Sequence, residues 1–302
     1  MLKRRVVLLS IVGLVAMAWV VVSRSQPELV SQMPINQVPI NQMYVFGDSL
    51  SDVGVSLRLS NGNSPPDPPY FQGRFSNGRV WVEYLAEALA VPVEQVSNAA
   101  GGGATTGLDA DRAVPGLLAQ VQSFLQANPS ADADALYVLW AGANDYLQGT
   151  STAALPVGNL RTAIASLIQA GAQRFLVGNL PDLGRLPATG NRPESAALSQ
   201  LTQAHNQTLR QALEELRQNS PEIQLVLLDI YTLYQDAIAN PTQYGFTNVT
   251  TGCLSTVGIC SQPNQFMFWD GIHPTTAAHR FMGEAARQAL AAAVAAAKNR
   301  AA

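Results

Sequence analysis

A serine near the start of the folded region has the surroundings of a candidate nucleophile. In residues 44–54, YVFGDSLSDVG, Ser49 follows apolar residues typical of a buried strand, at the point where small polar residues begin. A serine in such a turn is usually a turn former or a helix N-cap, and Asp52 three residues later fits that role. A nucleophilic serine also needs a base for its proton, a group that orients the base, and donors for an oxyanion. These three partners can be sought separately.

Of the three histidines, His273 is the best candidate for the base. His205 lies in a long helical pattern among glutamines and threonines, as on a solvated helix surface, and His279 lies inside the last helical segment. His273 instead lies in a turn, with Asp270 three residues before it. At this spacing the carboxylate can accept the Nδ1 hydrogen while Nε2 faces the serine. This segment alone is equally compatible with a turn-forming aspartate and a packed imidazole.

Two further segments could supply the oxyanion donors. Backbone amides donate best where no Cβ obstructs the approach, and glycines 101–103 offer such a place. Asn144 follows an apolar run that ends in Val-Leu-Trp, and its side-chain amide could donate as well. Taken singly, a glycine triplet and an asparagine are more often parts of turns. Their weight comes from occurring together with the serine and the histidine.

These residues can meet only if a sheet brings their segments to one edge. Short apolar runs alternate with longer helical patterns, which predicts a mainly parallel sheet with helices on both faces. The predicted strands are 44–46, 93–96, 135–140, 174–177 and 223–228, and the predicted helices are 80–89, 115–125, 155–169, 194–217 and a last one from Thr275 onward. In open sheets of this kind, ligand chemistry gathers beyond the carboxyl ends of the strands. Ser49, the glycines after Asn98, and Asn144 each follow a predicted strand.

Four short motifs together resemble those of the GDSL, or SGNH, hydrolase family. They are Gly47-Asp-Ser-Leu50, the glycine segment after Asn98, Gly142-x-Asn144 and Asp270-x-x-His273, and they occur in the order of the family. Residues 70–78 and 179–184 are similar to the branch that contains secreted lipases, phospholipases and hemolysin-like esterases. The G-x-S-x-G elbow of other lipases is missing, because Ser51 occupies the place of its second glycine.

The resemblance implies a fold and a role for each site residue. The expected fold is the SGNH hydrolase type of α/β fold, a three-layer α/β/α sandwich with a mainly parallel, flavodoxin-like sheet of five strands. Ser49 would be the nucleophile, His273 the base and Asp270 its orienter. Gly103 and Asn144 would join the Ser49 amide in the oxyanion hole, with Gly102 replacing Gly103 if the loop register differs.

The implied activity is hydrolysis of carboxylic esters through an acyl-enzyme, which requires no metal and no cofactor. The substrate would be a small-molecule or lipid ester. Three alternatives remain open from the sequence: an acyltransferase with the same triad, a non-catalytic domain that binds lipid or glycan, and metal-assisted hydrolysis by Asp48, Asp145 and His273. Residues 61–75, rich in proline and aromatics, could line the pocket or form a stiff surface loop. The apolar residues of 244–268 could border its mouth or belong to the core.

The N-terminal region predicts export. Residues 1–25 combine a basic start with an apolar run and are interpreted as a signal peptide or an N-terminal membrane anchor. Residues 26–42 resemble an extended linker, and residues 43–300 are the expected hydrolase domain. The basic start would stay in the cytoplasm and the remainder would cross the membrane. The expected location is therefore periplasmic or extracellular, and the apolar segment could keep the protein at the membrane.

The two cysteines of the chain are predicted to form a disulfide. Cys253 and Cys260 predict a small disulfide loop, worth roughly 2 to 3 kcal/mol in the chain-entropy model, because an exported protein meets oxidising conditions. A metal or redox pair is the weaker alternative, since no CxxC spacing or second pair exists.

With 13% charged residues and a net charge of −3, the chain has no basic surface stripe for nucleic acid, and no such partner is expected.

Overall fold

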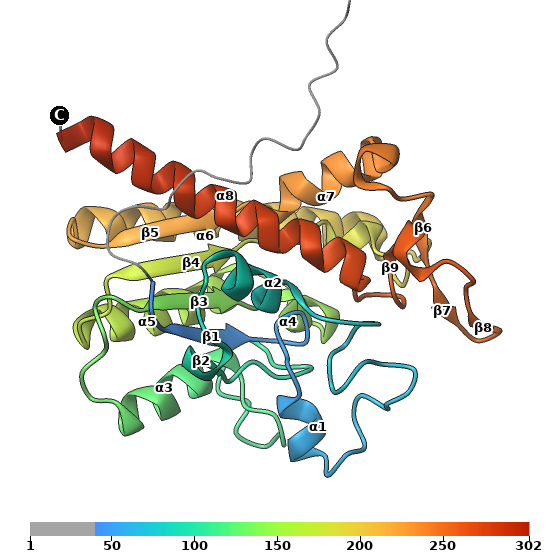
Figure 1. The fold of residues 1–302 in the computed structure, drawn as a ribbon, viewed down its shortest axis with the longest axis horizontal. Helices are drawn as coiled ribbons and strands as arrows, with labels where there is room; N and C mark the ends of the chain where they lie inside the picture. Colours follow the sequence, from blue (N-terminus) through green and yellow to red (C-terminus); the bar gives the residue numbers. More distant parts are fainter. Residues whose placement is uncertain (1–39, 302) are drawn as a thin grey trace, which may run out of the picture. The chain divides into compact units, whose positions relative to one another are not determined.

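Five parallel strands form the central sheet of the protein, whose computed structural model describes residues 40–301 (Figure 1). The strands are β1 (Met43–Gly47), β2 (Val96–Asn98), β3 (Leu136–Trp140), β4 (Arg174–Gly178) and β5 (Gln224–Leu228). Their spatial order is β2-β1-β3-β4-β5, and every neighbouring pair is parallel. This order is the flavodoxin-like one, so the predicted fold class is confirmed.

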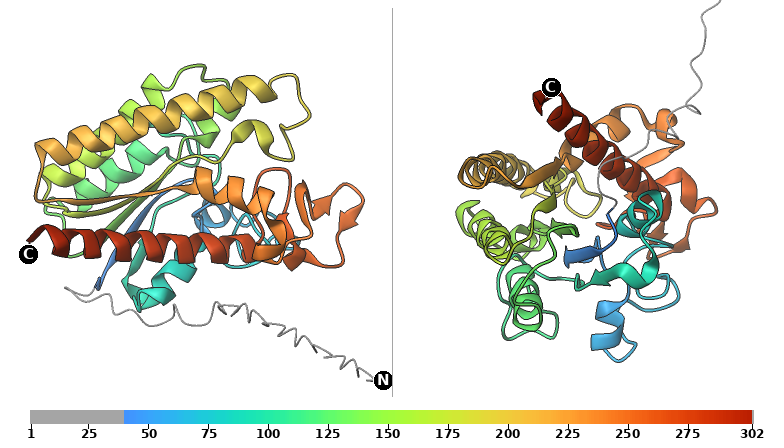
Figure 2. Two further views of the ribbon diagram at one scale, coloured as in Figure 1. Left: turned by 90° about the horizontal axis from the view of Figure 1, so that it is seen from above. Right: turned by 60° about the vertical axis from the view of Figure 1, so that its left-hand side comes forward.

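Helices cover both faces of the sheet, as expected for a parallel sheet with two buried faces (Figure 2). The helices are α1 (Val55–Leu59), α2 (Trp81–Ala88), α3 (Leu117–Ala127), α4 (Ala143–Leu147), α5 (Ala154–Gln169), α6 (Ser195–Asn219), α7 (Ile230–Ala239) and α8 (Thr276–Ala301). One apolar core joins α2, α7 and α8 to the sheet through residues such as Trp81, Tyr234 and Met282. A second core joins α3, α5 and α6 to the other face through Leu117, Leu160 and Leu209. The result is a three-layer sandwich.

The interior strand β3 shows why the sequence folds in this way. All five of its residues, Leu-Tyr-Val-Leu-Trp, are buried, so its alternate side chains enter both cores. A continuous apolar run bounded by turn residues is typical of a strand with helices on both faces. Because β1, β3 and β4 run parallel, their carboxyl ends meet at one edge of the sheet, and Ser49 and Asn144 follow two of these ends.

The prediction of a strand over residues 93–96 is wrong in its first three residues. Val93–Gln95 form a 3₁₀ turn, and β2 begins only at Val96. Pro92 has a φ of −59°, and the amide of Gln95 donates to the Pro92 carbonyl at 2.9 Å, which closes the turn. Val93 is 77% exposed, so its apolar side chain contributes little to the core. An apolar residue that follows a proline fits the start of a strand or of a turn, and here it begins a turn.

Two small sheets lie between α7 and α8, beyond the carboxyl edge of the central sheet (Figure 1). β6 (Asn248–Gly252) pairs in parallel with β9 (Phe266–Phe268), and β7 (Leu254–Ser255) with β8 (Gly258–Ile259) forms a hairpin. A disulfide joins Cys253 and Cys260 at the base of this hairpin. β9 leads directly into the turn that carries Asp270 and His273.

The predicted signal peptide or anchor, residues 1–25, lies outside the described residues, as does the predicted linker up to residue 39. Within residues 40–301, no helix combines the length and the apolar character that crossing a bilayer requires.

Candidate active site

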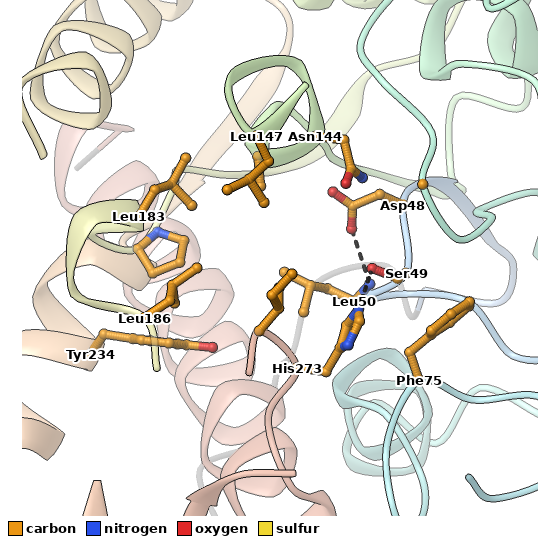
Figure 3. Close-up of a pocket in the computed structure, with 14 residues that line it drawn as sticks. Asp48, Ser49, Leu50, Phe75, Asn144, Leu147, Leu183, Leu186, Tyr234 and His273 are labelled. Carbon is orange, nitrogen blue, oxygen red and sulfur yellow. Dashed lines mark hydrogen bonds between the residues drawn. The ribbon is translucent and has the colours of Figure 1, made fainter. Parts of the chain in front are cut away.

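Ser49, His273 and Asp270 form a continuous hydrogen-bonded row. The Ser49 Oγ lies 2.9 Å from His273 Nε2 (Figure 3). On the other side of the ring, His273 Nδ1 lies 2.7 Å from Asp270 Oδ2. The serine lies 224 residues from the histidine in the sequence, so the fold brings the two together. Ser49, from the start of the predicted domain, and the pair His273 and Asp270, from its end, therefore lie within hydrogen-bonding distance of one another.

The Asp270 carboxylate fixes the tautomer of the histidine. Burial alone would raise the pKa of this carboxyl, but hydrogen bonds from His273 and Tyr70, together with the charge of His273, lower it to about 2. Asp270 is then ionised and can only accept hydrogen bonds, so Nδ1 of His273 carries the proton that faces it. Nε2 of the neutral ring is free to accept the Ser49 proton.

Two tight turns aim these side chains. After β1, the Ser51 amide donates to the Asp48 carbonyl at 3.1 Å and the Leu50 amide donates to the Asp48 carboxylate at 3.0 Å, which closes the turn that presents Ser49. After β9, the amides of Ile272 and His273 both donate to Asp270 Oδ1, at 2.8 and 2.7 Å. Each turn is thus closed by backbone amides that donate to an aspartate, which is Asp48 in the first turn and Asp270 in the second.

Gly103 and Asn144 lie at the same cavity as Ser49. Asn144 donates one of its side-chain N–H groups to the Ala104 carbonyl at 2.9 Å, and a primary amide has a second N–H. The Gly102 amide is already bound by Ser56 Oγ at 2.6 Å and Asp52 Oδ2 at 3.0 Å. Gly103 has a φ of +79°, which glycine adopts without strain. Of the two candidate glycines, Gly103 is therefore the better placed to donate its backbone amide into the cavity.

The cavity has a volume of about 180 Å³ and a polar end and an apolar end. Ser49 and His273 lie at its polar end, and the leucines Leu147, Leu183 and Leu186 lie across from them (Figure 3). An apolar pocket with a few convergent polar groups is typical of a small-molecule site. A cavity of roughly 150 Å³ holds a benzene ring, so this one suits a short acyl group.

The cavity also contains a buried carboxyl beside the serine. Asp48 is 2% exposed, and burial, together with the nearby Asp145 and Asp52, raises its pKa to about 7. The Leu50 amide and His273 act in the opposite direction. Because the folded protein holds this proton more tightly than the unfolded chain does, Asp48 favours folding below pH 4, and this contribution is lost as the pH rises through 7.

Asp48→Asn is therefore expected to remove a pH-dependent loss of stability. The side-chain oxygen of the asparagine can keep the Leu50 hydrogen bond without a charge. The free energy of unfolding of the variant should therefore exceed that of the wild type at pH 8 by on the order of 2 to 4 kcal/mol and match it near pH 4. Thermal unfolding of both proteins from pH 4 to 8 measures this difference. Asp111→Asn, at an exposed aspartate, controls for removal of a charge. A difference between wild type and Asp48→Asn that is independent of pH would contradict the assignment.

The groups considered for metal-assisted hydrolysis do not converge. Among residues 40–301, no three histidine, cysteine or acidic side chains lie close enough to hold a metal ion. The Asp145 carboxylate instead accepts hydrogen bonds from the Thr106 amide at 2.9 Å and the Thr106 hydroxyl at 2.7 Å. Asp145, on α4, therefore holds the segment that follows glycines 101–103 in place.

The other two histidines are buried in the core, so the prediction of a solvated His205 is wrong. His205 is 0% exposed and its Nδ1 lies 2.9 Å from the Tyr146 hydroxyl, which ties α6 to α4. His279 is also 0% exposed and accepts the Trp81 amide at 3.2 Å. Burial lowers the pKa of His205 to about 4 and that of His279 to about 3. Both rings are neutral packing groups at neutral pH.

The pocket walls differ from those considered in the sequence. Of residues 61–75, only Phe75 lines the cavity, and none of the apolar residues of 244–268 does. Phe246, Met267 and Phe268 are at most 2% exposed and belong to the core, which is the second of the two alternatives that the sequence left open for residues 244–268. Four further lining residues cannot be identified from local sequence patterns, because segments after β3, β4 and β5 bring them into one cavity: Leu147, Leu183, Leu186 and Tyr234.

The fold and the cavity with its hydrogen-bonded serine are compatible with an α/β enzyme that hydrolyses esters. The chain belongs to the GDSL-like Lipase/Acylhydrolase family, whose profile matches residues 43–286. The resemblance inferred from the four motifs is thereby confirmed, and the protein is a carboxylic ester hydrolase.

Relatives in this family include an acyltransferase and a hemolysin. The chain is 28% identical to a phosphatidylcholine-sterol acyltransferase of Aeromonas hydrophila, covering 89% of this chain and 95% of the relative. It is 30% identical to a thermolabile hemolysin of Vibrio parahaemolyticus, covering 81% and 62%. Among solved structures, LAE5, an alpha/beta hydrolase enzyme from the metagenome of Lake Arreo, shares the fold with a TM-score of 0.51 at 16% identity, covering 84% of this chain and 96% of that one.

Proposed function

We propose that this protein is an exported serine esterase or lipase that cleaves carboxylic esters through a covalent acyl-enzyme on Ser49. The observation that carries the proposal is the 2.9 Å contact between Ser49 Oγ and His273 Nε2, with Asp270 on the other ring nitrogen. The basic and apolar start of the chain supports export. No metal or cofactor takes part in these steps.

The reaction proceeds in two steps. His273 Nε2 takes the Ser49 proton as the serine oxygen attacks the ester carbonyl, and the imidazolium then gives that proton to the leaving alcohol. Water attacks the resulting acyl-enzyme, with His273 again as the base, and releases the acid and the free serine. Asp270 keeps Nδ1 protonated and stabilises the imidazolium in both steps.

The tetrahedral intermediates carry an oxyanion that needs preorganised donors. The amides of Ser49 and Gly103 and the second N–H of the Asn144 side chain are the proposed donors. Support comes from the position of all three residues at the cavity and from the engagement of Gly102 with Ser56 and Asp52.

Asn144→Ala is expected to lower kcat by about 100- to 1,000-fold, because it removes a donor that acts mainly in the transition state. Its hydrogen bond to Ala104 contributes about 1 kcal/mol to stability, so the variant should still be folded at 25 °C. Asn159→Ala, which removes a side-chain hydrogen bond to Thr106, is the matched control and should keep kcat within about twofold. If Asn144→Ala lost stability but kept kcat, Asn144 would be a structural residue.

The apolar end of the cavity favours a short acyl group. Its volume of about 180 Å³ and its leucine walls suit an acyl chain about as large as a benzene ring. A panel of aryl esters of increasing acyl length tests this function directly. The proposal expects kcat/KM to rise from acetyl to about hexanoyl and to fall for long chains. A complete absence of turnover across the panel would reject the esterase assignment.

Acyl transfer is the second candidate, favoured by the similarity to the Aeromonas acyltransferase. A transferase would use the same acyl-enzyme but release it to an alcohol. Product analysis with and without added alcohol distinguishes the two activities. A new ester formed at the expense of the free acid would identify a transferase, whereas an unchanged yield of acid would identify a hydrolase.

A further inference from the structure

A tyrosine from a distant loop shares the carboxylate of the hydrogen-bonded row. The Tyr70 hydroxyl donates to Asp270 Oδ2 at 2.7 Å, and this is the same oxygen that accepts His273 Nδ1 at 2.7 Å. Tyr70 lies 200 residues before Asp270 in the sequence. Burial and the hydrogen bond to Asp270 raise the pKa of the Tyr70 phenol, so it remains a donor at any working pH.

Tyr70 is the one donor to this carboxylate that comes from outside its own turn, among the residues that the structure describes. Oδ1 accepts the amides of Ile272 and His273, and Oδ2 accepts the His273 ring and the Tyr70 hydroxyl. The first three donors belong to residues 272 and 273 and follow from the local fold of the turn. The fourth donor, the Tyr70 hydroxyl, depends entirely on the placement of residues 61–75, the proline-rich loop.

Aromatic contacts hold the Tyr70 ring in place. The ring packs edge-on against Trp269 at 6.5 Å and against Phe75 at 6.1 Å, measured between ring centroids. Phe75 in turn lies 5.1 Å from the His273 ring. Such aromatic pairs contribute about 0.5 to 1.5 kcal/mol beyond the area that they bury. The hydroxyl is therefore aimed at Asp270 by a rigid cluster rather than by a free side chain.

The backbone of the loop is tied to the same turn. The Tyr70 amide donates to the Pro66 carbonyl at 3.1 Å, within the loop. Just after the loop, the Ser76 hydroxyl donates to the Pro274 carbonyl at 2.9 Å, and the Asn77 side chain accepts the Thr276 amide at 2.9 Å. Residues 70–77 thus fasten onto both sides of His273.

We propose that Tyr70 is a positioning residue that orients the Asp270 carboxylate and limits how strongly it pairs with His273, an inference that rests on the proposed esterase function. A carboxylate oxygen with two donors divides its charge between them, so each bond is weaker than it would be alone. The shared bond also stops the carboxylate from rotating away from the ring. The proline-rich loop, which does little to line the pocket, thereby acquires a role in the reaction.

Tyr70→Phe tests this proposal, because it keeps the ring packing and removes only the hydroxyl. Loosening of the carboxylate should lower kcat by roughly 5- to 20-fold with KM within about twofold, in keeping with the loss of one hydrogen bond to a charged group. The undivided charge of Asp270 should favour the imidazolium, so the acid limb of the kcat/KM profile should move to higher pH by about 0.5 to 1 unit. The other titratable groups near His273, which are Asp48 and His279, are unchanged in this variant.

Tyr84→Phe is the matched control. Its phenol forms a 2.7 Å hydrogen bond with Thr276 Oγ1 at the start of α8, close in sequence to the turn but without contact to Asp270. The control should change neither the pH profile nor kcat beyond twofold, even if it lowers stability as much as Tyr70→Phe does. Unfolding curves of both variants establish that they are folded under assay conditions.

Proton NMR of the free enzyme gives an answer that does not require turnover. The resonance of the His273 Nδ1 proton should move downfield in Tyr70→Phe, since its acceptor is no longer shared, and should stay in place in Tyr84→Phe. An unmoved resonance together with an unmoved acid limb would overturn the proposal for Tyr70. If the wild type cleaved no ester, the proposed function would fail, and the resonance alone would still decide whether Tyr70 weakens the pairing of Asp270 with His273.

Discussion

Ser49→Ala is expected to lower kcat for ester hydrolysis by at least about 10,000-fold, because no acyl-enzyme can form without the hydroxyl. The remaining rate would come from substrate binding and the oxyanion donors, which act without a nucleophile. KM should change little, since the cavity walls are untouched. Initial rates with an aryl ester, on protein free of wild-type contamination, measure the effect.

Ser51→Ala is the matched control for this variant. Ser51 lies in the same turn and is buried, but its hydroxyl accepts the Trp81 ring N–H at 3.0 Å and has no contact with His273. Its removal should cost about 1 to 3 kcal/mol of stability and leave kcat within about threefold. Equal losses of activity in Ser49→Ala and Ser51→Ala would mean that the turn matters only for folding.

Asp270→Asn is expected to lower kcat by about 10,000-fold, although its geometry stays nearly the same. An asparagine would offer either its oxygen or its NH₂ group to the histidine. When the NH₂ group faces Nδ1, the ring proton moves to Nε2, and His273 can no longer accept the Ser49 proton. The imidazolium would also lose the charge that stabilises it. Steady-state rates near neutral pH measure this loss.

The control for Asp270→Asn is Asp229→Asn, at the N-cap of α7. Asp229 accepts hydrogen bonds from Asn179 and Thr232 and does not line the cavity. An asparagine is an equally good N-cap, so this variant should keep kcat within about twofold. An Asp270→Asn protein with more than a tenth of the wild-type rate would remove Asp270 from the mechanism.

The sequence predicted the sheet and its reactive edge because both follow from local patterns. The run Leu-Tyr-Val-Leu-Trp of β3 identifies a buried strand, and the polar residues after it identify the edge. Asp270 and His273 are three residues apart, so one turn suffices to place them together. Ser49 could be assigned to the same edge because its strand is parallel to β3.

Contacts between distant segments could not be predicted in this way. The polar neighbours of His205 in the sequence indicate a solvated side chain, whereas its partner Tyr146 lies 59 residues away on α4. The Tyr70 hydroxyl meets Asp270 only because the loop after α1 folds back onto the turn before α8. For Val93, the local pattern itself was ambiguous, since a β-branched residue after a proline fits a strand or a turn.

Labelling with a fluorophosphonate tests the central claim most directly, namely that Ser49 is a nucleophile activated by His273. Peptide mass spectrometry of the labelled wild type should find one adduct per protein, on Ser49, and Ser49→Ala should remain unlabelled. Asp270→Asn should label far more slowly than the wild type. An adduct on another residue, or a folded wild-type protein that stays unlabelled, would contradict the account.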